Sequence, residues 1–206
     1  MWRKYSYLVL LSYLIIGFFI WPQVGIIALV CMLAPIIVAV KHGRKWCGWY
    51  CPRGSLWDNV FTKINNNKKI PKWAQNKYFR IFIVGLIFTV FFYQMYFAWG
   101  DLGKIGLVFL QIIFITSIVG AVLGLVYNPR TWCSFCPMGS IAAWVSPRKI
   151  RKINNECIEC KKCAKVCPMQ VITEVKKGAI IEDKDCLQCD NCIETCPKNA
   201  ISCENC

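Results

Sequence analysis

The chain has 206 residues, of which 56% are hydrophobic, and its mean hydropathy of +0.42 argues against a wholly soluble protein. A formal net charge of +14 would suit a nucleic-acid-binding protein, but the charge is unevenly distributed. Residues 1–153 hold eighteen basic side chains against two acidic ones, whereas residues 154–206 hold seven against nine. Positive charge within the hydrophobic part of a chain is typical of orientation in a membrane, so the composition does not favour nucleic-acid binding.

Four apolar stretches in residues 1–153 are long enough to cross a bilayer, which takes about 17 to 25 residues each. They are Tyr5–Trp21, Val24–Val40, Tyr78–Trp99 and Ile105–Tyr127. Basic residues gather at one side of them, because the two short connections at the other side hold only Lys104. Loops rich in Lys and Arg stay in the cytoplasm. The sequence therefore predicts a multi-pass protein of the cytoplasmic (inner) membrane, with both termini in the cytoplasm.

A cysteine motif follows the second stretch and returns after the fourth. It reads Arg44-x-Trp46-Cys47-x3-Cys51-Pro52-x-Gly54-Ser55 and then Arg130-x-Trp132-Cys133-x2-Cys136-Pro137-x-Gly139-Ser140. Two spans and one motif make each unit, so we expect an axis along the membrane normal that brings the four thiols to one depth. Three interpretations stay open for this Cys-Pro site: a third iron–sulfur cluster or other metal, redox-active dithiols of lowered pKa, or inert buried thiols. The residues concerned are Cys47, Cys51, Cys133 and Cys136.

The C-terminal part carries a second repeat, which reads Cys157-x2-Cys160-x2-Cys163-x3-Cys167-Pro168 and then Cys186-x2-Cys189-x2-Cys192-x3-Cys196-Pro197. Three thiolates of each half come from one tight loop, and the fourth cysteine binds the other half's [4Fe-4S] cluster. The first cluster site is therefore predicted to consist of Cys157, Cys160, Cys163 and Cys196. The second is predicted to consist of Cys186, Cys189, Cys192 and Cys167. Zinc sites usually take two Cys pairs at wider separation, and a disulfide-stabilised domain fits poorly with two identical spacings.

The predicted fold is an integral membrane α-helical domain, with four transmembrane helices in two repeated hairpins, followed by an α+β ferredoxin domain of the bacterial 2[4Fe-4S] type. The expected boundaries are 1–153 for the membrane domain, 154–201 for the ferredoxin domain, and 202–206 for a tail with Cys203 and Cys206. Within the ferredoxin domain, residues 171–175 and 179–181 are expected to pair as a hairpin closed at Gly178. A domain this small needs its clusters to hold the fold together.

These features together resemble the NapH/MauN-type membrane ferredoxins, and also the membrane module of NosR-type and FixG/CcoG-type proteins. The resemblance runs from the first span to Pro197. Cys47-x3-Cys51-Pro52 matches the family motif, whereas Cys133-x2-Cys136-Pro137 is one residue shorter. The resemblance implies an electron-transfer subunit that works between the quinone pool and a partner reductase or flavoprotein.

We therefore expect a membrane-anchored subunit that relays single electrons, from a cytoplasmic or membrane donor such as a ferredoxin, to quinone or to another subunit of a redox complex. Such a protein is part of an oxidoreductase complex rather than a stand-alone enzyme, and no residue is assigned as catalytic. One alternative is an assembly factor that hands on copper to a respiratory enzyme, since soft thiolates favour Cu(I). A redox-sensing regulator is a second alternative.

Overall fold

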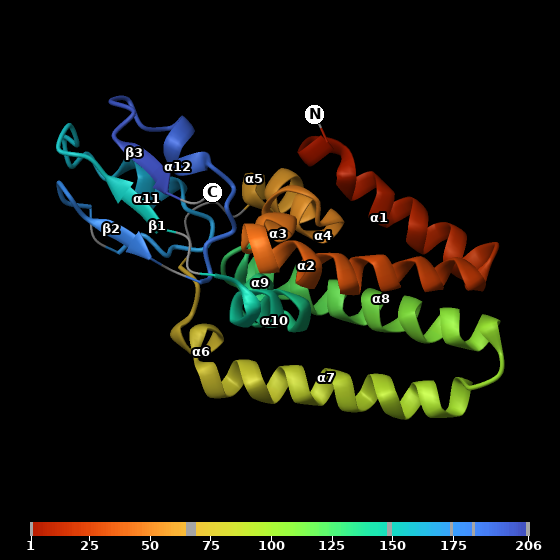
Figure 1. Ribbon diagram of the computed structural model, residues 1–206. Helices are drawn as coiled ribbons and strands as arrows, with labels where there is room; N and C mark the ends of the chain where they lie inside the picture. Colours follow the sequence, from red (N-terminus) through yellow and green to blue (C-terminus); the bar gives the residue numbers. More distant parts are fainter. Residues whose placement is uncertain (1, 65–68, 148–149, 174, 183, 205–206) are drawn as a thin grey trace.

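The computed structural model describes residues 2–64, 69–147, 150–173, 175–182 and 184–204. Long helices lie side by side, a small domain with a three-stranded sheet lies at one end of them, and short helices fill the region between (Figure 1). The long helices are α1 (Trp2–Phe19), α2 (Ala28–His42), α7 (Lys77–Ala98) and α8 (Leu102–Val126). The first pair is joined by the 3-10 helix η1 (Pro22–Ile27), and the second by a turn at Gly100. Both connections lie at the end far from the sheet (Figure 1).

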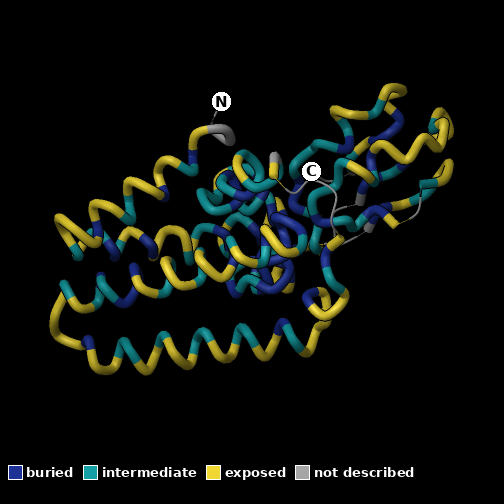
Figure 2. Tube along the Cα trace, turned by 180° about the vertical axis from the view of Figure 1, so that it is seen from behind, coloured by how far each residue is buried: buried dark blue, intermediate teal, exposed yellow. Residues whose placement is uncertain are grey.

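Three of the described helical segments are long and apolar enough to cross a membrane, namely Pro22–His42, Lys77–Ala98 and Leu102–Val126. The apolar part of α1 is shorter and covers Tyr5–Phe19, so the predicted count of four spans stays a prediction. The outward faces of these helices are exposed along their length (Figure 2), and Ile37 and Phe82 are 69% and 64% exposed. Apolar side chains in such numbers suit contact with lipid and support membrane association.

At their outer end, the two helix pairs touch backbone to backbone. A Cβ on Gly25 would collide with the backbone of Gly106 in α8, and a Cβ on Gly106 would collide with the carbonyl of Pro22. The Tyr13 hydroxyl donates to the carbonyl oxygen of Gly25 at 2.9 Å, which ties α1 to the same place. Small residues let helix backbones approach in a membrane, where close packing takes the place of the hydrophobic effect.

The short helices at the inner end come from both halves of the membrane domain. After α2 follow α3 (Lys45–Trp49), α4 (Pro52–Leu56), the π-helical η2 (Trp57–Phe61) and α5 (Thr62–Ile64), while α6 (Lys72–Gln75) precedes α7. After α8 follow α9 (Thr131–Phe135) and α10 (Pro137–Val145). Trp57, Trp132 and Phe135 are at most 4% exposed and give this region a packed aromatic core.

The C-terminal domain has an antiparallel sheet of order β2-β1-β3, with β1 (Ile150–Ile153) in the centre between β2 (Ile180–Glu182) and β3 (Ile201–Glu204). Helices α11 (Lys162–Val166) and α12 (Asn191–Glu194) each contain the third cysteine of one motif, Cys163 and Cys192. The core is formed by buried isoleucines from the sheet and the loops together with two cysteines: Ile153, Ile172, Ile181, Ile201, Cys163 and Cys192.

The predicted hairpin within this domain is wrong. β2 pairs with β1, and the described residues of 171–175 form no strand. Ile172 turns into the core instead, while the place beside β2 is taken by β1, which precedes both cysteine loops. Gly178 does form the expected turn, with φ 74°. The sheet thus begins four residues before the boundary expected at 154, and Cys206 of the tail lies outside the described residues.

Candidate metal centres

The two cysteine loops of the ferredoxin domain repeat one backbone conformation. Among the described residues, positive φ values of non-glycine residues lie between 49° and 60° and occur at Glu159, Lys161, Gln170, Gln188, Asp190 and Asn199. These residues form three pairs at equivalent positions of the two halves. A left-handed residue costs about 1–2 kcal/mol, so six of them persist only where the surroundings require them. Such turns direct successive backbone N–H groups into a concavity that suits anionic iron–sulfur sites.

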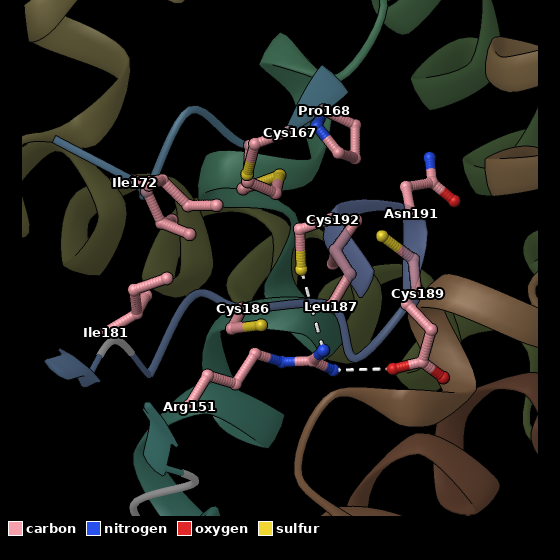
Figure 3. Close-up of a pocket in the computed structure, with 13 residues that line it drawn as sticks. Arg151, Cys167, Pro168, Ile172, Ile181, Cys186, Leu187, Cys189, Asn191 and Cys192 are labelled. Carbon is pink, nitrogen blue, oxygen red and sulfur yellow. Dashed lines mark hydrogen bonds and ion pairs between the residues drawn. The ribbon is translucent and has the colours of Figure 1, made fainter. Parts of the chain in front are cut away.

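Each loop encloses a cavity lined by cysteines from both halves. One cavity is lined by Cys167, Cys186, Cys189 and Cys192 (Figure 3). The other is lined by Cys157, Cys160, Cys163 and Cys196. In each cavity, three cysteines come from one loop and the fourth comes from the other half, which is how bacterial two-cluster ferredoxins distribute their ligands.

Donors around these cavities can offset the charge of ligated thiolates. Arg151 of β1 reaches Cys192 Sγ at 3.6 Å through Nη1 and pairs with Asp190 Oδ1 at 2.7 Å through Nη2 (Figure 3). The Ala200 N–H donates to Cys196 Sγ at 3.3 Å. Burial raises the pKa of Cys192 to about 11, although Arg151 opposes it, so a metal bound here would supply the charge that keeps this thiolate deprotonated.

Within the described residues, no three Cys, His, Asp or Glu side chains lie close enough together to share one metal ion. The thiolates of a [4Fe-4S] cube each bind a different iron. The two cysteine loops therefore fit such clusters, because they combine a cavity with N–H groups that point into it and a buried cation.

The two Cys-Pro motifs have the same architecture despite their different spacing. Cys51 and Cys136 are the N-caps of α4 and α10, and a proline follows each at the first helical position. The Cys51 N–H donates to the carbonyl five residues back, whereas the Cys136 N–H donates to the carbonyl four residues back, both at 2.9 Å. The additional residue of the first motif is therefore absorbed as one wider helical turn.

Each motif receives the arginine of the other. Arg44 donates through Nη2 to the Cys133 carbonyl at 2.7 Å, and Arg130 donates through Nη1 to the Cys47 carbonyl at 3.4 Å. Arg130 also lies 3.6 Å from Cys133 Sγ and forms two hydrogen bonds with Asp58, at 2.8 and 2.6 Å. The two motifs are thereby interlocked, and two buried cations lie among their thiols.

Two thiols of the Cys-Pro site, Cys47 and Cys51, are affected by the charges of other cysteines of the site. Burial raises the pKa of Cys47, and the neighbouring Cys136 and Cys133 raise it further. Arg44 lowers this pKa, but the net shift is upward. Burial, followed by Cys47, raises the pKa of Cys51 to about 12. Reactive dithiols need a lowered pKa, so the direction of these two shifts gives no support to the dithiol interpretation.

Buried donors without a partner surround the same site. Among the described residues they include Arg44 Nε, Trp132 Nε1, Ser134 Oγ and Ser140 Oγ. A buried donor left unpaired costs about 1–3 kcal/mol, which makes an anionic, sulfur-rich group a favourable neighbour. The repeated motif already contained Arg44, Trp132 and Ser140, but the sequence could not show that these polar atoms lack a partner.

The second cysteine loop of the ferredoxin domain lies directly on the first Cys-Pro motif. Trp49 Nε1 donates to the Gln188 carbonyl at 2.8 Å. A Cβ on Gly48 would collide with the carbonyl oxygen of Leu187. Gly48 is the neighbour of Cys47, and Leu187 is the neighbour of Cys186. The second cluster site and the Cys-Pro site are therefore in contact through adjacent residues.

Charge pairing fixes the same interface. Asp185 accepts from Arg44 at 3.0 Å and from Arg80 at 2.8 Å, and both arginines belong to the membrane domain. Further along, the N–H of Ile70 donates to Gln170 Oε1 at 3.1 Å. Because two cations share one carboxylate, this contact is a network rather than an isolated surface pair.

A large cavity, of about 210 Å³, lies between the long helices and reaches the Cys-Pro site. Its walls include Phe88, Phe91 and Phe109, and Cys47, Cys51 and Cys136 lie among its lining residues. Arg53 also lines it, and its Nη1 donates to Thr116 Oγ1 at 2.8 Å. Apolar walls with a few polar groups at one place are typical of a small-molecule site.

Comparison with known proteins agrees with this arrangement. A "4Fe-4S binding domain" family model matches residues 24–71 and 106–154, with one Cys-Pro motif in each match, and a "4Fe-4S dicluster domain" model matches residues 156–201. The methylamine utilization ferredoxin-type protein MauN of Methylorubrum extorquens is 26% identical over 171 residues, 75% of this chain and 58% of MauN. The chain belongs to the NapH/MauN-type 4Fe-4S ferredoxin family.

Two further proteins are similar to this chain. An uncharacterised protein of Methanocaldococcus jannaschii is 30% identical over 161 residues, 68% of this chain and 65% of the relative. YccM of Escherichia coli, provisionally named an electron transport protein, is 25% identical over 180 residues, 73% of this chain and 48% of YccM. The chain thus spans 48% to 65% of the length of these relatives. No solved structure matches. Both family models give 4Fe-4S binding as the functional class of this chain.

Proposed function

We propose that this chain is a membrane-anchored subunit that relays single electrons from a cytoplasmic or membrane donor to quinone. In this proposal, the first and second cluster sites each hold a [4Fe-4S] cluster and the Cys-Pro site holds a third, which together supply one-electron chemistry. The chain's own residues determine the spacing and the electrostatics. Four transmembrane helices, with α1 as the fourth, and cytoplasmic termini belong to the same proposal.

The observation that carries this proposal is the contact between Gly48 and Leu187. It joins the residue next to Cys47 with the residue next to Cys186, so the second cluster site lies against the Cys-Pro site. Cys160 of the first cluster site is exposed, which leaves that site accessible from solution. The contacts thus support an order that runs from the first cluster site through the second to the Cys-Pro site.

The large cavity supports quinone as the acceptor at the membrane end. A quinone combines an apolar tail with ring oxygens that gain negative charge on reduction. The aromatic walls suit the apolar tail. Arg53 and Cys51 both line the same cavity. No carboxylate of the described residues pairs with Arg53, so its charge is available to a ring oxygen. Reduction to the quinol takes two electrons, delivered singly, and two protons.

The test is a single-turnover measurement in proteoliposomes that contain a long-chain quinone confined to the bilayer. The protein is reduced with dithionite, excess reductant is removed, and reoxidation of the clusters is followed by absorbance. We compare wild type with Gly48→Ala, whose Cβ forces the two domains apart, and with Gly85→Ala, where a Cβ meets nothing within 4 Å. A variant with Ser at all four Cys-Pro positions completes the set.

Wild type and Gly85→Ala should reoxidise alike, Gly48→Ala should slow by about tenfold or more, and the four-serine variant should lose the reaction. The ferredoxin clusters should stay intact in all four proteins. Reoxidation of the four-serine variant at the wild-type rate would contradict the relay and would bring the copper-handling alternative forward.

A further inference from the structure

The two cysteine loops of the ferredoxin domain present the same surface twice, and only one copy is covered. In the second loop, Leu187 and Gln188 are 2% and 5% exposed because they lie on the Cys-Pro motif. The equivalent residue of the first loop, Ile158, is 57% exposed. The backbones match, since Glu159 and Gln188 have φ values of 54° and 53°. The first loop is therefore a free copy of a surface that already serves as a contact between two redox sites.

The two copies have opposite charges at two positions, whereas the position of Asp185 is acidic in both, with Glu156 in the free loop. The covered loop carries Asp185, Asp190 and Glu194, and Asp185 meets the arginines of the membrane domain. At the positions equivalent to Asp190 and Glu194, the free loop carries Lys161 and Lys165.

Exposed lysines surround the free loop, namely Lys161, Lys162, Lys165 and Lys198. Within the part of the chain that the structure describes, none of the four forms an ion pair. Two exposed glutamates, Glu156 and Glu159, reduce this positive charge but do not cancel it.

We propose that the Ile158 face, formed by Ile158, Lys161, Lys162, Lys165 and Lys198, docks a small soluble acidic protein that carries a one-electron cofactor near its surface. This inference rests on the proposed function. Ile158 supplies the apolar centre that Leu187 supplies in the covered copy. The lysines attract the acidic partner over a long range and raise its association rate, an effect that weakens as salt is added. One electron passes from the reduced carrier to the first cluster site; the carrier is oxidised, the site is reduced, and no bond or proton is exchanged.

The experiment uses the full chain, purified anaerobically in nanodiscs of neutral lipid, with an acidic plant-type [2Fe-2S] ferredoxin as the probe. Two variants, Ile158→Glu and the double Lys161→Glu/Lys162→Glu, are compared with Ile180→Glu and Lys184→Glu. Ile180 is a matched control, because it is 58% exposed on β2 of the same domain. Binding of the oxidised probe is measured as a function of salt, and electron transfer from the reduced probe is measured by stopped flow.

Both test variants should weaken binding by about tenfold and flatten its salt dependence, while both controls should stay within about twofold of wild type. Iron content and reduction by dithionite should not change. The proposal is overturned if wild type does not bind the probe, if the test variants bind like wild type, or if Ile180→Glu weakens binding equally. Dithionite reduces the clusters without binding to this face. Loss of dithionite-driven quinone reduction would therefore contradict the relay, whereas the binding measurement alone decides the docking proposal.

Discussion

Arg44 donates through Nη2 to the Cys133 carbonyl at 2.7 Å, across the boundary between the two halves of the membrane domain. Arg130 makes the reverse contact with the Cys47 carbonyl at 3.4 Å. The two arginines are 1% and 2% exposed, so each is fixed within the other half's motif. Neither motif is complete without the other, which gives a physical reason for the sequence Arg-x-Trp-Cys to occur twice.

Replacing Arg44 by glutamine should therefore damage the Cys-Pro site more than the ferredoxin domain. The change removes a buried cation from among the thiols and breaks one of the two arginine ion pairs of Asp185. We expect a loss of about 3 kcal/mol in stability and loss of iron from the Cys-Pro site. The thermal midpoint and the iron content measure these effects, with Lys45→Gln as the control. An unchanged midpoint and full iron content would refute the role assigned to Arg44.

Asp185→Asn should loosen the ferredoxin domain from the membrane domain without unfolding either. Asp185 holds two arginines of the membrane domain, at 3.0 and 2.8 Å. We expect reoxidation of the reduced clusters by bilayer quinone to slow by about tenfold, with iron content unchanged. Glu194→Gln removes an exposed carboxylate of the same domain and should have no effect. Equal slowing in the two variants would show that only overall charge matters.

The glycines of the two motifs should be intolerant of any side chain. A Cβ on Gly54 would lie 2.9 Å from Arg130 Nη1, and one on Gly139 would lie 2.6 Å from Arg44 Nη2. Gly54→Ala and Gly139→Ala should each cost about 1–3 kcal/mol through overpacking and displace a guanidinium from the thiols. Thermal unfolding of both variants beside Gly85→Ala checks this. The prediction fails if all three unfold at the same temperature.

The left-handed residues should limit which side chains the ferredoxin loops accept. Asn199 has φ 49° and follows the Cys196-Pro197 pair. Asn199→Val should cost about 1–2 kcal/mol and speed cluster loss on warming, whereas Asn199→Gly should not, since glycine adopts this conformation freely. The decay of the cluster absorbance with temperature measures both, and Lys198→Val controls for the added valine. Cluster loss at the same rate in Asn199→Val and Lys198→Val would rule out backbone strain as the cause.

The family and its motifs were readable from the sequence because cysteine spacing directly reflects how one loop surrounds a cluster. The cavities lined by Cys157 and Cys186 follow from the same local geometry. The strand pairing was predicted wrongly, because the sequence favoured a local hairpin at Gly178, whereas the sheet uses β1 from before both loops. Pairing between strands that are distant in the sequence cannot be predicted from the local residue pattern.

The contact between the domains could not be predicted for the same reason. Nothing near Asp185 in the sequence points to Arg44 or Arg80, which lie more than a hundred residues away. The exchange of Arg44 and Arg130 between the motifs is also a tertiary feature. The repeat did suggest that the four thiols meet, but it could not show that burial raises the pKa of Cys51, a direction that gives no support to a reactive dithiol.

The central claim is that the Cys-Pro site holds a third cluster in contact with the second. Iron and acid-labile sulfide per chain, measured on anaerobically purified wild type and on the variant with Cys47, Cys51, Cys133 and Cys136 changed to serine, test it most directly. We predict about twelve irons in the wild type and about eight in the variant, with matching sulfide. About eight irons in both proteins would contradict the third cluster and the relay that depends on it.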